Sequence, residues 1–249
     1  MQSTSTPRPS AARRIPRIPA WLKWAYTGFL LVLVPVYWRH YGPANFLYFC
    51  DMALFLTLAA IWLESSLPAS MAAVGILLPQ IFWCLDFASE LLGVHLTGMT
   101  GYMFEAQRPL FLRSLSLFHG WLPFLLLFLV KRLGYDQRAL KAWSGLAAIL
   151  CLVAFFLLPP AGAALANPSF PRNVNYVFGL NDAHPQTWMP QGVYLVAWML
   201  TLFGVAYLPT HWVLGRVAPC LRPKVDASRR VSAAAPSGTF APPRQSAGH

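Results

Sequence analysis

The sequence predicts an all-α integral membrane protein, a bundle of about six transmembrane helices with both termini on the cytoplasmic side. Three observations predict this fold class. Hydrophobic residues make up 57% of the chain and charged residues only 11%, whereas about a quarter of the residues in a soluble domain are charged. Six apolar runs approach or exceed the roughly 20 residues that cross the hydrocarbon core of a bilayer. Most basic residues lie in connections that would face one side of the membrane.

The six apolar runs define one membrane domain, residues 21–214. In chain order they are Trp21–Trp38, Ala44–Leu63, Leu67–Val94, Pro109–Val130, Ala139–Leu158 and Gly192–Leu214. The first run follows an arginine-rich segment, as in a signal peptide, but it leads into Tyr37–His40 rather than a small-residue cleavage site, so we expect an uncleaved helix. Small residues are expected at the helix contacts, namely Ala72, Gly75, Gly145 and Ala148.

The distribution of Lys and Arg predicts the orientation. The N-terminal tail, the connection at 131–141 and the C-terminal tail hold four, four and six basic residues, whereas the three alternate connections hold one each, Arg39, Arg108 and Arg172. With six helices every basic cluster falls on one side, which is then cytoplasmic. The expected location is the cell membrane, the cytoplasmic or inner membrane in a bacterium. Residues 1–20 and 215–249, rich in Ser, Pro, Ala and Arg, are expected to be disordered basic tails.

The net charge of +11 does not indicate a nucleic-acid partner, because its basic clusters alternate with apolar runs as topology signals do. The expected partner is the lipid bilayer, and the sequence leaves the oligomeric state open. On the outer side lie two polar connections, at about 95–108 and 159–191. Loops of this length in a compact protein often form lids or binding segments.

Ionisable residues inside the predicted spans are the first candidates for a site, because such residues are costly in a membrane and usually face the bundle interior. The second span carries Cys50 and Asp51, about two turns below its outer end. The third carries Asp86 and Glu90, four residues apart and therefore on one helix face. The fourth carries Arg113 and His119. All lie in the outer halves of three consecutive helices, so the sequence predicts a polar pocket that opens outward.

Structural roles remain open for the same residues. Asp86 and Glu90 also fit the end of an overlong third helix at the interface. Arg113 also fits a side chain that extends to the outer headgroups, and His119 a hydrogen-bonded packing residue. Cys50 on its own also fits a small buried apolar residue.

Three chemistries use these residues. Cys50 as nucleophile with His119 as base would support acyl transfer or hydrolysis of a lipid. Asp51 and His119 would instead form an acid–base pair or a proton relay. A metal bound by His119 and the carboxylates is the least supported, because one central His provides too few nitrogen ligands. We therefore expect no metal and no cofactor. The four Cys residues have neither zinc-ligand nor disulfide-framework spacing.

Three segments resemble those of a known family. Phe46–Ala53, Ser114–Trp121 and Asn173–Gly179 are similar in order and approximate spacing, over about residues 44–212, to motifs of the YwaF-like bacterial integral membrane proteins. Distant eukaryotic relatives of that family transfer or hydrolyse lipid acyl groups. The resemblance implies a lipid-like substrate and adds Asn175 and Tyr176 to the site. The family's His before the Cys is replaced here by Tyr48 and Phe49.

The sequence thus predicts a multi-pass membrane protein with an outward-facing polar pocket that binds or acts on a lipid or lipophilic molecule. The candidate catalytic residues are Cys50, Asp51 and His119. The candidate substrate-binding residues are Asp86, Glu90, Arg113, Asn175 and Tyr176. The alternative is a non-catalytic membrane component, either a small carrier or a scaffold subunit of a membrane complex, and the sequence leaves open whether the protein is an enzyme.

Overall fold

The computed structural model describes residues 18–221, with side chains from 18 to 217, and this part of the chain is helical without a strand. The predicted all-α class is therefore confirmed. The helices are α1 (Ala20–Tyr41), α2 (Phe49–Leu63), α3 (Ser66–Leu91), α4 (Leu110–Leu115), α5 (Phe118–Leu133), α6 (Ala139–Leu157), α7 (Gln191–Thr201) and α8 (Leu208–Leu221). Shorter elements are η1 (Pro43–Leu47), η2 (Gly101–Met103), η3 (Val174–Tyr176) and the π-helical η4 (Leu202–Tyr207). Residues 1–17 and 222–249, which include most of both predicted tails, lie outside the described residues.

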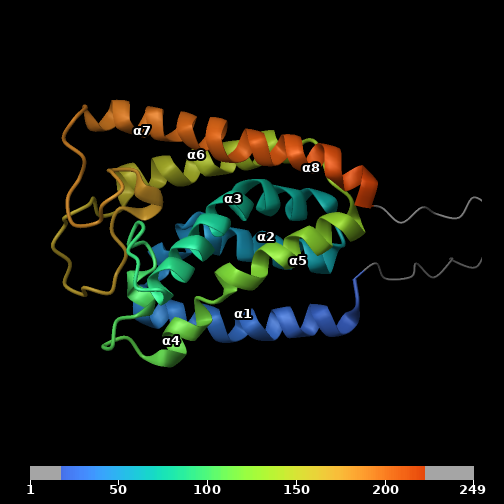
Figure 1. Ribbon diagram of the computed structural model, residues 1–249, viewed down its shortest axis with the longest axis horizontal. Helices are drawn as coiled ribbons and strands as arrows, with labels where there is room; N and C mark the ends of the chain where they lie inside the picture. Colours follow the sequence, from blue (N-terminus) through green and yellow to red (C-terminus); the bar gives the residue numbers. More distant parts are fainter. Residues whose placement is uncertain (1–17, 222–249) are drawn as a thin grey trace, which may run out of the picture.

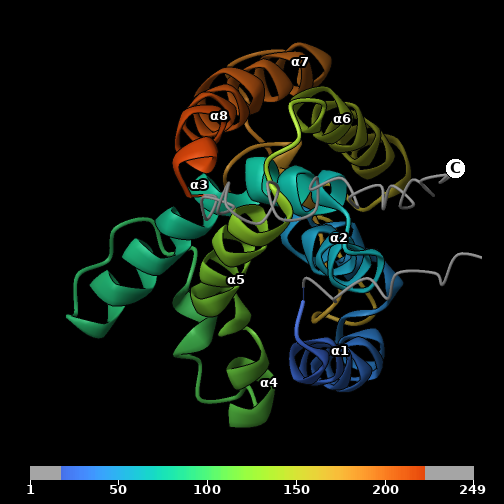
Figure 2. The same ribbon diagram turned by 90° about the vertical axis from the view of Figure 1, so that its right-hand side faces the viewer.

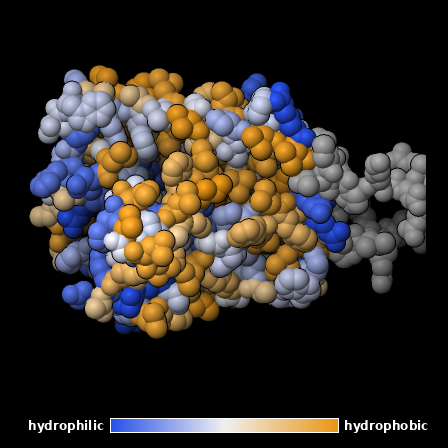
Figure 3. Space-filling model, in the orientation of Figure 1, coloured by the Kyte–Doolittle hydropathy of each residue, from blue (hydrophilic) through white to orange (hydrophobic). Residues whose placement is uncertain are grey.

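Five helical segments among the described residues are long and apolar enough to cross a membrane, and α2 is a sixth, shorter apolar helix of 15 residues. The five are Ala20–Tyr41, Ser66–Leu91, Leu110–Leu133, Ala139–Leu157 and Gln191–Val217. Large hydrophobic side chains cover the outer surface, as with Phe124 and Phe156, which are 74% and 71% exposed. In Figure 3 such residues form an apolar zone along the middle of the molecule, with hydrophilic residues gathered at its ends. The chain is thus compatible with a multi-pass membrane protein.

The second span begins later than the sequence predicts. The expected helix from Ala44 is divided by Tyr48, whose extended backbone (ψ 143°) separates η1 from α2. Cys50 and Asp51 therefore lie in the first turn of α2, and their expected position two turns inside a helix is wrong. The physical reason is a distant partner, because the N–H of Phe49 donates to the side chain of Asn175 instead of to a preceding helical turn.

The fourth and sixth spans are also interrupted. The fourth is divided into α4 and α5 at Ser116 and Leu117, where short-range bonds such as His119 N–H to the Ser116 carbonyl tighten the backbone. The sixth changes from α-helix to π-helix over η4 and continues past the expected end at Leu214 as far as Leu221. π-Helical turns are frequent at functional sites.

The connections fall into two sets at opposite ends of the bundle (Figure 1). The start of α1, the end of α8 and the short turns after α2 and α5 lie at one end. The long connections 92–109 and 158–190 lie at the other, which we call the loop end. Viewed along the bundle, α2, α3 and α5 lie between α1 on one side and α6–α8 on the other (Figure 2).

The centre of the bundle is α3, which contacts α2, α5, α6 and α8. It packs tightly on α6 at Gly75, where an added Cβ would lie 2.0 Å from the indole of Trp143. Trp143 and Ala72 are completely buried, so small residues permit this contact as predicted. Gly145, by contrast, is exposed and has no neighbour within 4 Å of its Cβ position. Its expected packing role is wrong, because that face of α6 points away from the bundle.

Candidate functional site

A cavity of about 720 Å³ lies at the loop end of the bundle. It is bounded by the end of α1, the start of α2, the middle of α3, the start of α5, both long loops and η4. Five of the eight residues predicted for the site line it, and these are Cys50, Asp51, His119, Asn175 and Tyr176. Asp86, Glu90 and Arg113 are not among its lining residues. The cavity thus unites residues that are far apart in the sequence, such as Phe49 and Asn175, which are 126 positions apart.

Asp51 is the buried carboxylate of the cavity, with 3% of its surface exposed. Its Oδ2 accepts a hydrogen bond from Asn45 Nδ2 at 3.2 Å and a weaker one from the Cys50 thiol at 3.7 Å. Its Oδ1 has no hydrogen-bond partner among the described residues. The N–H groups in the first turn of α2 favour a negative charge at this position. A buried carboxylate that is only half satisfied is unusual and is a candidate for interaction with a ligand.

Gln80 on α3 is a second under-satisfied polar residue of the cavity wall. It is 2% exposed, and neither its Nε2 nor its Oε1 has a hydrogen-bond partner within the described part of the chain. The antiparallel helices α2 and α3 are joined at Glu64 and Ser65, and Asp51 and Gln80 are at similar distances along the chain from this turn. They therefore lie at about the same level of the bundle. The sequence marks Gln80 only as a polar residue in an apolar span.

His119 is held rigidly at the start of α5. Its Nδ1 lies 2.7 Å from the carbonyl oxygen of Ser116, and because a carbonyl can only accept, Nδ1 carries the proton and Nε2 is the acceptor of the neutral ring. The ring stacks on Trp83 and Phe118, with centroids 4.7 and 4.0 Å away. No hydrogen bond joins His119 to Cys50 or Asp51 among residues 18–217, so the three line one cavity without forming a connected triad.

Asn175 fixes the start of α2. Its Oδ1 accepts the N–H of Phe49 at 3.0 Å, its Nδ2 donates to the carbonyl of Leu47 at 2.9 Å, and its own carbonyl accepts from the indole of Trp198 at 2.8 Å. Asn175 and Tyr176 have φ values of 59° and 60°, in the left-handed region that asparagine tolerates better than most residues. Asn175 thus positions Cys50 and Asp51 through the backbone.

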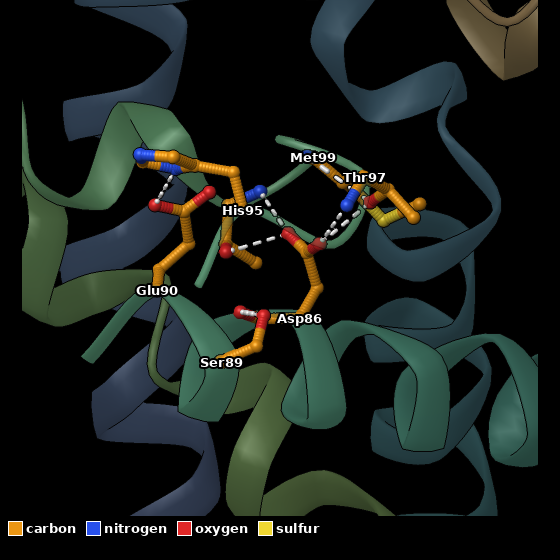
Figure 4. Close-up of polar contacts among 7 residues, drawn as sticks. Asp86, Ser89, Glu90, His95, Thr97 and Met99 are labelled. Atoms are coloured by element: carbon orange, nitrogen blue, oxygen red, sulfur yellow. Dashed lines mark hydrogen bonds and ion pairs between the residues drawn. The ribbon is translucent and has the colours of Figure 1, made fainter. Parts of the chain in front are cut away.

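Asp86 binds the loop that follows α3. Its two carboxylate oxygens accept the backbone N–H and the hydroxyl of Thr97 and of Thr100, at 2.6–2.8 Å. Figure 4 shows the Thr97 side of this arrangement, with Glu90 paired to His95 beside it at 2.8 Å. The hydrogen bond and charge of Glu90 raise the pKa of His95 above its ordinary value. Since Gly98, Met99 and Tyr102 of this loop line the cavity, Asp86 holds one of its walls in place.

Arg113 also contacts this loop. Its Nη1 donates to the carbonyl of Met103 at 2.9 Å, while its Nε has no partner among the described residues. Three of the predicted residues therefore lie behind the cavity lining and not in it, namely Asp86, Glu90 and Arg113. Each is bonded to the 92–109 connection.

The cavity has a charged rim that the sequence did not predict as part of the site. Arg108 donates from Nε to Glu105 at 2.7 Å and from Nη1 to the Tyr41 hydroxyl at 3.0 Å. Its guanidinium lies 5.9 and 5.4 Å from the ring centroids of Tyr41 and Tyr102. In the sequence Arg108 is only the single basic residue of a connection between two predicted spans. No local sequence pattern predicts how the 92–109 connection folds to bring Arg108 to Tyr41.

Chemically, the site combines a thiol, a carboxylate, an imidazole and an amide inside the bundle with arginines and tyrosines at the loop end. Among the described residues, no group of three or more His, Cys, Asp and Glu side chains is arranged to hold a metal ion. Comparisons of the chain with protein-family models, curated proteins and solved structures find no match in any of the three.

Proposed function

We propose that this chain is a multi-pass cell-membrane protein whose cavity binds a lipid or lipophilic molecule, with acyl transfer or hydrolysis as its reaction. The observation that carries the proposal is the cavity itself. Its inner wall holds Asp51 and Gln80, two buried polar side chains with unpartnered atoms. An amphiphile would satisfy such a site better than a fully polar or a fully apolar ligand.

The side wall of the cavity supports a ligand that comes from the membrane. Phe82 on α3 and Val205 on η4 both line the cavity, yet they are 54% and 61% exposed on the outer surface of the bundle. The cavity lining is therefore continuous with the apolar outer surface. A hydrocarbon chain placed between α3 and η4 would leave its ester group near Cys50 on α2.

The proposed reaction begins at Cys50. Transfer of the thiol proton to Asp51 Oδ2, its present acceptor, would leave a thiolate that attacks the acyl carbonyl and forms a thioester. The leaving alkoxide would take up the proton, and water or a second alcohol would then release the acyl group. His119, with Nε2 as acceptor, is the base proposed for this second step. Membership of the YwaF-like family, inferred from the motif resemblance, is part of the same proposal.

The proposed orientation places the loop end outside the cell and both termini in the cytoplasm. Four basic residues near the turn after α5, Lys131, Arg132, Arg138 and Lys141, are exposed at the end where α1 starts and α8 stops, which supports a cytoplasmic assignment of that end. Fusion of a reporter enzyme that is active only outside the cytoplasm tests it. Activity of a C-terminal fusion would overturn the orientation.

Thioester capture tests the reaction. A chain that keeps only Cys50, with Cys84, Cys151 and Cys220 changed to Ala, is incubated in membranes with an alkyne-tagged diacyl lipid. We expect label that hydroxylamine removes. Asp51→Asn, which removes the proposed acceptor of the thiol proton, should reduce its formation about a hundredfold or more, and His119→Ala should slow its release, as for loss of a general base in each step. The matched control keeps only Cys84, whose thiol contacts the His119 carbonyl at 3.7 Å but does not line the cavity, and should remain unlabelled.

The non-catalytic alternative is favoured by one observation, the lack of a hydrogen bond between His119 and the Cys50–Asp51 pair within the described residues. A carrier or scaffold subunit would bind the tagged lipid without cleaving it. Reversible binding with no hydroxylamine-sensitive label on Cys50 would therefore exclude the nucleophile and leave the binding function. Equal labelling of the Cys84 control would exclude a specific site.

A further inference from the structure

We infer that Arg108 and Arg172 form an anion subsite at the rim of the cavity, and that the lipid bound there carries an anionic phosphate headgroup. The inference depends on the proposed function, since it names the headgroup of the lipid that the cavity would bind. It concerns the loop end, whereas the proposed reaction concerns the residues of α2 and α5.

Arg108 is oriented in advance for a ligand. Glu105 and Tyr41 take hydrogen bonds from Nε and Nη1, and the two tyrosine rings limit the movement of the guanidinium. The second Nη has no hydrogen-bond partner within the described part of the chain. An arginine that is fixed in this way and still has a free donor loses little side-chain entropy when it binds an anion.

Arg172 approaches the same cavity from the other long loop. It is half-buried and lines the cavity, but among residues 18–217 its side chain makes no hydrogen bond and no ion pair within 4.0 Å. Phe170, two residues earlier, places its ring 3.5 Å from the Cβ position of Gly42, next to Tyr41. The loop that carries Arg172 therefore packs beside the tyrosine that binds Arg108.

The charge distribution favours a phosphate at the rim rather than deep in the cavity. All Lys and Arg residues that line the cavity are at the loop end, and they are these two arginines. The inner wall holds the carboxylate of Asp51, which would repel an anion. Glu105 and Asp182 also line the cavity and offset part of the positive charge, so the subsite depends on geometry as well as on net charge. A phosphate between the arginines would leave the acyl chains directed toward Cys50 and the apolar side wall.

The test measures binding of two dioleoyl lipids with the same chains, phosphatidic acid and diacylglycerol, to the full chain in non-ionic detergent at fixed ionic strength. We expect phosphatidic acid to bind about tenfold more tightly, as expected for charge-assisted hydrogen bonds. Arg108→Gln and Arg172→Gln should each remove most of this preference, measured as the ratio of the two affinities in the same variant. Arg39→Gln is the matched control, because Arg39 is exposed on α1 near the loop end but does not line the cavity.

Glu105→Gln distinguishes recognition from a structural role, because removal of the compensating charge should strengthen phosphatidic acid binding severalfold. If Arg108→Gln fails to fold, Arg172→Gln, which removes no hydrogen bond present in the structure, decides alone. Equal affinity for the two lipids, or a preference that survives both arginine changes, would overturn the subsite but leave the lipid-binding proposal intact. Binding of inorganic phosphate alone, with the same arginine dependence and no gain from acyl chains, would replace the lipid by free phosphate. Failure of both lipids to bind would contradict the proposed function itself.

Discussion

The carboxylate of Asp86 accepts four hydrogen bonds from the loop after α3, whereas that of Asp51, at the start of α2, accepts one from an amide and one from a thiol. The two side chains are almost equally buried, at 1% and 3% exposure. Burial therefore does not distinguish them, but hydrogen bonding does. A fully satisfied carboxylate stabilises the structure around it, while a half-satisfied one imposes a cost that a ligand can offset.

The largest effect on stability is expected for Asp86→Ala. The change leaves four donors of Thr97 and Thr100 without their acceptor, and we expect the free energy of unfolding to fall by about 3 kcal/mol. Denaturant unfolding in detergent, together with proteolysis of the 92–109 connection, measures it. Ser89→Ala is the control, since the Ser89 hydroxyl only donates to the Asp86 carbonyl of its own helix. Similar losses for the two variants would contradict the anchoring role of Asp86.

Asn175→Ala is expected to lower the free energy of unfolding by about 2 kcal/mol, because it removes two hydrogen bonds at the start of α2 and a residue suited to a left-handed backbone. Asn175→Asp can still accept from Phe49 but cannot donate to Leu47, so its loss should be intermediate. Unfolding measurements on the two variants provide this order. A loss for Asn175→Asp as large as that for Asn175→Ala would contradict a stabilising role of the Phe49 contact. Cys50 labelling should decrease in the same order as stability, because Asn175 positions that residue.

Asp51→Leu is expected to affect lipid binding rather than stability, the opposite of Asp86→Ala. Replacing a half-satisfied carboxylate by an apolar side chain of similar volume should change the free energy of unfolding by less than about 1 kcal/mol, or increase it, while lipid binding is lost. Unfolding and lipid binding are measured on the same sample. A large loss of stability would show that Asp51 is structural like Asp86, and the contrast between them would fail.

The smallest effect on stability is expected from a change of pH that alters the charge of His95. The pKa of His95 is raised by Glu90, so the pair stabilises the loop fully below the ordinary histidine pKa of about 6.5. This contribution is lost as the pH rises through the higher pKa of the folded state. Hydrogen exchange of the 92–109 connection should therefore become faster, beyond its intrinsic pH dependence, across that range. The difference should disappear in His95→Ala, and a slower exchange at high pH would contradict the pairing.

Hydropathy was sufficient to predict the helical class and the approximate spans, because each span needs a long apolar run regardless of its neighbours. It failed at Phe49, where the helix start is determined by Asn175, and at Ser116, where the fourth span is interrupted. Both depend on contacts that no local pattern encodes.

The candidate site was predicted only in part, because several of its contacts also join residues that are far apart in the sequence. Polar residues inside apolar runs identified Cys50, Asp51 and His119, which line one cavity. The role of Asp86 depends on two threonines of the 92–109 connection, and that of Arg108 on Tyr41, which is 67 positions away. Sequence alone offers no means to pair such residues when they lie in connections of variable shape.

The contact between Asn175 and the start of α2 also has a consequence for biogenesis. The ribosome makes α2 and α3 long before the loop that contains Asn175, which is 126 positions after Phe49. The first helices can enter the membrane as apolar segments, but the first turn of α2 reaches its final form only when the 158–190 connection has been synthesised and docked. Chains truncated before residue 175 should therefore insert and still lack a formed cavity. The cavity that contains the candidate site residues would therefore form last, when nearly the whole membrane domain is already in place.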